Sequence, residues 1–342
     1  MLKNDRPYRK YSYFSACTFY LGAIIVTLVA QALAGFVSAA LAGKYPDIAK
    51  NGDFNTAFMI VIQLLYLAVM IGYSKLNGYK LNFTVFSDSR TGKKLDALCV
   101  VIPALCAVIL MAGMYLPTIW YGYFTRYALH IPPDYGEIDL TSASSVVMVV
   151  IASVFLAPVC EEAIYRGVLF NGLKTEKSTL KAVMLSAVAF LFMHMSPVQV
   201  VFQFSLGVLS AFIAHRTNRL APSVVLHATA NALALVMQLT PFAAVLEGCV
   251  AWLTSHVAAA VFITLGAFAV AGALLFVLVR FVLGRGHGTE TTEPMQHCED
   301  GGTSAKDEAL AAIEKKNGSI RYYIALGICI LMFVINLTVA VL

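Results

Sequence analysis

Charge is what this sequence has little of. Charged residues make up 13% of its 342 residues, while hydrophobic ones make up 59%; an average soluble domain has about a quarter charged residues. This composition excludes a disordered chain and an ordinary cytosolic enzyme. The net charge is only +5, and the basic residues are dispersed along the chain. They form no basic cluster of the kind that binds nucleic acid.

Paired cysteines are also missing. The chain has seven cysteines, an odd number, and none of them form a CxxC motif. This excludes a secreted disulfide scaffold and a cysteine-based zinc framework. We expect free thiols, most of them buried in apolar runs. The residues are Cys17, Cys99, Cys106, Cys160, Cys249, Cys298 and Cys329.

What the sequence does have is long apolar stretches. About 20 apolar residues are needed for a helix to cross a bilayer, at 1.5 Å per residue. The candidate stretches are 14–42, 54–76, 95–117, 143–172, 181–195, 198–214, 220–239, 254–283 and 322–342. We therefore predict an all-α, polytopic membrane helical bundle of about nine transmembrane helices.

The fifth and sixth stretches are short, and only Met195–Val198 separates them. They form either a tight hairpin of two spans or one helix broken at Pro197. The hairpin is favoured because the charges that follow then fall on the expected side of the membrane.

Positive charge is asymmetric between the loops, which predicts an orientation. Basic residues precede the first span and follow the second, fourth and sixth, whereas the loops 118–141 and 240–253 are poor in them. The N-terminus is therefore expected in the cytoplasm of a cell-membrane protein and, with nine spans, the C-terminus outside. Residues 284–321 lack apolar patterning and are expected to form a mobile cytoplasmic loop with at most a short surface helix over 307–316.

Charged and polar residues concentrate in the middle of the chain, inside apolar stretches where they are costly and usually functional. The fourth stretch carries Glu161, Glu162 and Arg166, the fifth carries His194, and the seventh carries His227 and Asn231. Counted by helix rise, the residues other than Glu162 and Arg166 lie about 12 to 20 Å from the cytoplasmic boundary. We therefore expect these segments to place their polar groups in one layer.

The spacing suggests different roles for the two glutamates. Glu162 and Arg166 are four residues apart, the spacing of a helical ion pair, and fit a structural clamp. Glu161 is then free to act as a general base that activates water. A nearby histidine would share the proton, hold the water or bind a metal, while His227 and Asn231 would stabilise an oxyanion. Interhelical hydrogen bonding alone is the alternative for these polar residues.

Three motifs carry a resemblance to a known family. They are EExxxR at Glu161, Glu162 and Arg166, FxxxH at Phe190 and His194, and HxxxN at His227 and Asn231. Together they resemble the CPBP family of intramembrane proteases, also called the CAAX-protease, bacteriocin-processing or Abi family. The resemblance covers about 143–240, which would be the catalytic core. It divides the chain into three N-terminal spans (1–142), this core, and C-terminal helices with the polar loop (241–342).

The resemblance implies catalysis by Glu161 with help from His194, and metal binding or oxyanion stabilisation by His227 and Asn231. If a metal is used, zinc held by His194, His227 and Glu161 is implied; a metal-free glutamate mechanism is the alternative. The chain has no HExxH, rhomboid-like serine or GxGD motif.

The sequence thus predicts an intramembrane endopeptidase that works in the lipid bilayer. Its substrate would be a peptide or protein: a lipidated chain, a leader peptide or a bacteriocin. A non-catalytic scaffold or bacteriocin-immunity protein of the same fold is the alternative. A proton-coupled transporter is less favoured, because the sequence shows one polar cluster and no internal repeat.

Overall fold

The structure is a computed structural model that describes residues 11–45, 47, 52–77, 97–128, 130, 142–194, 196–197, 199–238, 240–282 and 305–341. Every regular element in these ranges is a helix. The long single helices are α1 (Tyr13–Leu41), α2 (Gly52–Asn77), α3 (Leu98–Ala128), α11 (Val257–Val277) and α12 (Ala305–Val341). Between α3 and α11 lie α7 (Thr179–Met193), α8 (Val200–Thr217), α9 (Ala221–Met237) and α10 (Thr240–Ser255).

The fourth span is one continuous helical rod with changes of winding. It consists of α4 (Ala143–Val149), the π-helical segment η2 (Val150–Leu156), α5 (Ala157–Glu162), the π-helical segment η3 (Ala163–Phe170) and α6 (Asn171–Lys174). A further π-helical turn, η4 (Leu278–Val282), continues α11.

The predicted all-α polytopic bundle is confirmed, but the count of nine spans is not. Among the described residues, seven helical rods are long and apolar enough to cross a membrane, and α7 and α9 are apolar but shorter. The segments at α7 and α8 form two separate helices that pack along each other, as the predicted hairpin requires. Each predicted apolar stretch therefore coincides with a helix, whereas helix length limits how many are long enough to cross.

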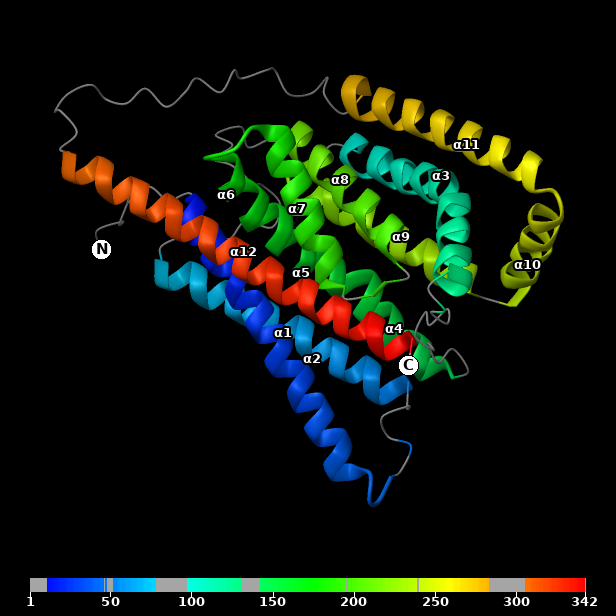
Figure 1. Ribbon diagram of the computed structural model, residues 1–342, viewed down its shortest axis with the longest axis horizontal. Coiled ribbons are helices and arrows are strands. Elements are labelled where there is room, and N and C mark those ends of the chain that lie inside the picture. Colours follow the sequence, from blue (N-terminus) through cyan, green and yellow to red (C-terminus); the bar gives the residue numbers. More distant parts are fainter. Residues whose placement is uncertain are drawn as a thin grey trace.

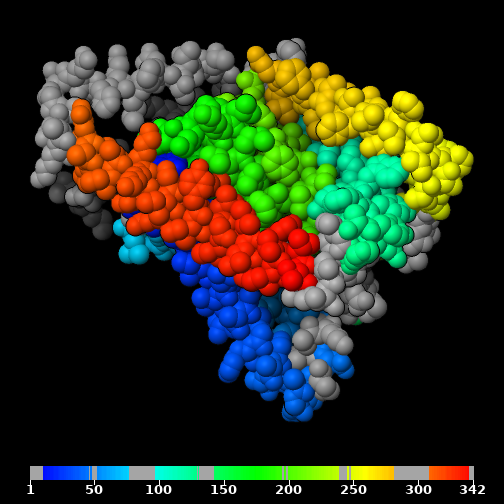
Figure 2. Space-filling model, viewed as in Figure 1, coloured from blue at the N-terminus to red at the C-terminus, as the bar shows by residue number. Residues whose placement is uncertain are grey.

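The two ends of the described chain pack together. Helix α12 lies along α1 and crosses the near face of the bundle in front of α1 and α2, whereas α11 lies along the outside of α3 (Figure 1). The space-filling view shows α12 covering much of this face (Figure 2). The fourth span lies inside, with η3 against α1 and α7, and η2 against α2 and α9. This arrangement surrounds the glutamate pair with helices from both halves of the chain.

Three predicted loops are wrong where the structure describes them. Residues 118–128 of the expected loop 118–141 continue α3. Residues 240–253, expected as an external loop, lie in α10, because this stretch contains several Ala and Leu residues, which favour helix. Helix α12 begins at Ala305, so the C-terminal part of the predicted loop 284–321 is helical; its first turns are rich in Ala, Glu and Lys, which favour helix. Residues 284–304 lie outside the described residues.

Contacts with α1 and with the turn after α6 also hold the early part of α12 in place. Lys315 forms an ion pair with Glu176 at 2.7 Å, and the Tyr13 hydroxyl lies 3.0 Å from the Ser319 hydroxyl. A Cβ at Gly318 would lie 2.7 Å from the Tyr13 ring, so glycine permits this close approach. Tertiary packing therefore extends the helix beyond the short surface segment expected at 307–316.

Helix α6 approaches the start of α1 closely enough to require glycine. A Cβ at Gly172 would lie 2.1 Å from the Ala16 Cβ and 3.1 Å from the Ser12 carbonyl oxygen. We expect Gly172→Ala to lower the free energy of unfolding by about 1–3 kcal/mol, because the two backbones must separate. Gly22→Ala is the matched control, since no atom lies within 4 Å of its added Cβ. Equal thermal stability of the two variants would contradict the close packing.

Candidate active site

The backbone that carries the two glutamates alternates between α and π winding. Glu161 and Glu162 end the short helix α5, between η2 and η3. Pro158 lies in the first turn of α5 and has no N–H to donate to the preceding turn. Wider π turns change the direction in which side chains leave a helix and are frequent at functional sites. Local winding therefore sets the direction of both carboxylates.

Glu162 is the centre of a fully buried polar network. Arg166 donates from Nη1 to Glu162 Oε1 at 3.0 Å and from Nη2 to the Gly207 carbonyl oxygen at 3.0 Å. The same Oε1 lies 3.0 Å from Nδ1 of His227. An ionised carboxylate only accepts, so His227 donates from Nδ1 and its Nε2 faces the other way. The ion pair expected from the spacing is present, and it also orients the histidine of α9.

Glu161 faces two histidines through one oxygen. Its Oε2 lies 3.8 Å from Nε2 of His194 and 3.9 Å from Nε2 of His227, and no atom of the described residues hydrogen-bonds to it. His194 lies just after α7 with Nδ1 2.9 Å from the Phe190 carbonyl oxygen, so that nitrogen is the donor and Nε2 faces the carboxylate. These separations exceed a direct hydrogen bond, and one water molecule can bridge them.

Phe190 packs against both imidazoles and the arginine. Its ring centroid lies 4.8 Å from the His194 ring and 5.6 Å from the His227 ring, both nearly perpendicular to it. The Arg166 guanidinium lies over the same ring at 4.4 Å. Edge-to-face and cation–π contacts of this kind fix ring orientation. The first residue of the FxxxH motif therefore holds the two histidines and the ion pair in register.

The site is buried but is open at His194. Glu161 and His227 are 7% and 2% exposed, whereas the side chain of His194 is 18% exposed. The Glu161 carboxylate is therefore most accessible on the His194 side.

Asn231 lies on the same helix as His227 but contacts a different partner. Its Nδ2 donates to the Ser153 carbonyl oxygen at 2.7 Å, inside η2. A π turn leaves main-chain carbonyls less well paired than an α turn, and this bond satisfies one of them. The observed contact braces the helix that carries Glu161; the predicted role of Asn231 at an oxyanion stays a prediction.

One polar residue beside Glu161 was missed by sequence reasoning. Gln63 of α2 is buried, and its Nε2 lies 3.5 Å from Glu161 Oε1. The available signal was a single amide in the middle of the apolar stretch 54–76. It was overlooked because nothing local relates α2 to the fourth span.

The described residues do not form a ready metal site. Among them, no group of three or more His, Cys, Asp or Glu side chains is arranged to hold a metal ion. Histidine and carboxylate suit zinc, but ligands on a tetrahedral zinc lie about 3.3 Å apart. The Glu161–histidine separations of 3.8 and 3.9 Å are wider. Zinc therefore does not fit this arrangement of side chains, and its use by the protein stays a prediction.

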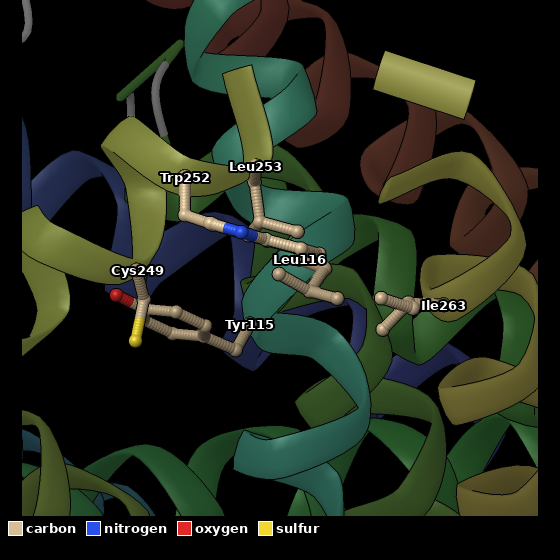
Figure 3. A pocket seen from close by; sticks show the side chains of 6 residues that line it. All are labelled: Tyr115, Leu116, Cys249, Trp252, Leu253 and Ile263. Atoms are coloured by element: carbon tan, nitrogen blue, oxygen red, sulfur yellow. The ribbon is translucent and has the colours of Figure 1, made fainter. Parts of the chain in front are cut away.

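An apolar cavity of about 390 Å³ lies elsewhere, between α3, α10 and α11. Tyr115, Leu116, Cys249, Trp252, Leu253 and Ile263 line it (Figure 3). None of the polar residues above is among its lining residues, so the cavity does not enlarge the site at Glu161.

The part of the chain that carries the site matches a known protein family. Residues 143–233 match a family model described as Rce1-like, "Type II CAAX prenyl endopeptidase Rce1-like". The predicted resemblance is confirmed. The Rce1-like segment runs from α4 through most of α9 and contains all three motifs. No curated protein and no solved structure matches the chain significantly.

The match and the apolar helices support a multi-pass membrane protein with an Rce1-like segment. The cell membrane as its location, the sides of its termini and the division into three regions stay predictions.

Proposed function

We propose that this protein is an intramembrane endopeptidase in which Glu161 activates the attacking water. One observation carries the proposal: Glu161 Oε2 is buried, lacks a hydrogen bond within the described structure, and is faced by two histidine Nε2 atoms at 3.8 and 3.9 Å. A carboxylate in this setting, too far from either histidine for a direct hydrogen bond, is suited to hold a bridging water and to act as a general base.

The proposed reaction proceeds in two proton transfers. Glu161 accepts a proton from the water as the water oxygen bonds to the scissile carbonyl carbon, and the carbonyl oxygen becomes an oxyanion. His194 holds the water at Nε2. Glu161 then returns the proton to the leaving nitrogen as the C–N bond breaks, which gives a new carboxyl terminus and a free amine.

His227 is the proposed oxyanion donor. Its Nδ1 donates to Glu162, which directs Nε2 toward the site, and Nε2 donates to the oxyanion when the ring carries both protons. Asn231 has a second amide hydrogen and is the further donor expected from the HxxxN motif. Arg166 pairs with Glu162, so the EExxxR motif supplies the base and the group that orients His227.

The proposed substrate is a peptide that ends in a prenylated Cys-aliphatic-aliphatic-X sequence, on the strength of the family description. The probe is a fluorogenic peptide of this kind, compared with the same peptide without its prenyl group, in protein reconstituted into nanodiscs. Faster cleavage of the prenylated peptide supports this substrate class. Cleavage of both at one rate would favour leader peptides or bacteriocins, the alternatives.

Metal content separates the two mechanisms. Because the carboxylate–imidazole distances are wider than zinc ligands require, we expect an active preparation to contain much less than stoichiometric zinc. The measurement is mass spectrometry of the purified wild type beside His194→Ala and His227→Ala. Stoichiometric zinc in the wild type, lost in both variants, would instead establish a metalloprotease.

A further inference from the structure

Gln63 is an amide in an apolar environment, where its burial is unfavourable unless it forms hydrogen bonds. It lies on α2, outside the Rce1-like segment, and is 5% exposed. Burying an amide without partners costs several kcal/mol in a membrane, where no water replaces the lost hydrogen bonds. A buried glutamine in this position is therefore expected to make specific polar contacts.

Gln63 binds the short helix α5 through both its backbone and its side chain. Its carbonyl oxygen accepts from the Cys160 thiol at 3.4 Å, and its Nε2 donates to Glu161 Oε1 at 3.5 Å. The amide must present its nitrogen here, because an ionised carboxylate only accepts. The Cys160 contact sets the position of α2 along α5. This position places the Gln63 amide beside the next residue, Glu161.

The two oxygens of Glu161 are thereby distinguished. Oε1 faces Gln63, while Oε2 faces the two histidines and has no hydrogen bond from the described residues. A hydrogen-bond donor on one oxygen restricts rotation of the carboxylate. It therefore lowers the conformational-entropy cost of keeping the other oxygen directed at the histidines. Gln63 Oε1 is buried and has no hydrogen-bond partner among the described residues, so packing leaves the amide dedicated to this one contact.

We propose that Gln63 is a positioning residue that holds the Glu161 carboxylate with Oε2 directed at the attacking water. The proposal rests on the proposed function. It extends the site to α2, which lies outside the Rce1-like segment.

The first test is a kinetic comparison on the prenylated fluorogenic peptide. Gln63→Ala is expected to lower kcat about ten- to a hundredfold with little change in KM, because the base is misaligned while the peptide contacts remain. Gln63→Asn, one methylene shorter, should behave like Gln63→Ala. The matched control is Gln203→Ala on α8, whose amide bonds Gln199 and makes no contact with Glu161. Equal kcat in Gln63→Ala and Gln203→Ala would overturn the proposal.

Gln63→Glu gives a readout that a packing role would not produce. The isosteric carboxyl group donates to Glu161 only while it keeps its proton, and two adjacent carboxylates resist ionising together. The titratable and charged groups near Glu161 besides position 63 lie on every element around it: His194, His227, Arg166, Tyr165, Cys160 and, one turn along α2, Tyr66. These groups are unchanged in the variant. We expect Gln63→Glu to approach wild-type kcat at low pH and to lose it at alkaline pH, whereas Gln63→Ala stays low throughout.

Infrared difference spectroscopy tests the contact without any substrate. The carboxylate bands of Glu161, identified by their loss in Glu161→Gln, should shift in Gln63→Ala and stay unchanged in Gln203→Ala. Unshifted bands in Gln63→Ala would overturn the proposal. Full peptide cleavage by Glu161→Gln would overturn the proposed function instead, and the infrared result would still decide the contact.

Discussion

Replacing Glu161 by glutamine is expected to lower kcat about 10²–10⁴-fold, the usual contribution of a general base. The substitution keeps the shape of the side chain but removes the group that accepts the proton from water. The fold should survive, because Glu161 Oε2 makes no hydrogen bond within the described structure whose loss would weaken packing. The measurement is single-turnover cleavage of the prenylated peptide by protein in nanodiscs.

The matched control is Glu176→Gln. Glu176 is an exposed carboxylate after α6 that pairs with Lys315, so it experiences the same chemical change outside the site. We expect its kcat to equal that of the wild type. If Glu161→Gln also cleaves at the wild-type rate while it binds peptide normally, Glu161 is not the base. A folded Glu161→Ala variant that still protects cells from a membrane-active peptide would favour the non-catalytic scaffold.

The second large effect is expected on stability. Arg166→Met should lower the free energy of unfolding by about 3–5 kcal/mol, because it leaves the Glu162 carboxylate buried without its cation. Both members of the pair are fully buried and lie 3.0 Å apart. Methionine keeps much of the volume under the Phe190 ring, so the loss reports charge more than packing. Denaturant unfolding of the purified protein measures it.

Two comparisons make this result specific. Lys315→Met breaks the exposed pair with Glu176 and should cost at most about 1 kcal/mol, since solvent screens that pair. The double variant Glu162→Gln/Arg166→Met should recover part of the loss, because neither charge is then left alone. Equal destabilisation by Arg166→Met and Lys315→Met would show that Arg166 does not compensate a buried charge.

The polar cluster was predictable to a useful degree. Because burying Glu161, His194 and His227 in apolar helices is costly, the sequence predicted that they share one layer. The structure brings both histidines within 4 Å of Glu161. The Glu162–Arg166 pair followed from helical spacing alone. The link from Glu162 to His227 did not, because it joins residues 65 positions apart on different helices.

The errors in the fold prediction arose because segments were judged by their own composition, without the helices that pack against them. The polar start of α12 reads as a solvated loop because it buries little of its own surface. Its contacts to Tyr13 of α1 and to Glu176 after α6 hold it against two other parts of the chain. The stretch of α10 was predicted as a loop because it lies between two longer apolar stretches and lacks basic residues, whereas its Ala and Leu residues favour helix.

The sequence by itself determined the class of protein, the helix-forming stretches, the hairpin at Pro197 and the motif residues of the Rce1-like segment. These depend on hydropathy and on spacing along one helix, both of which are local. Three contacts were decided only by the tertiary structure. His227 bonds Glu162 and faces Glu161, Asn231 bonds η2, and Gln63 lies against Glu161, which is 98 positions away in the sequence. Apolar patterning predicts which face of a helix is buried, but the way the helices pack determines the partner of each polar group.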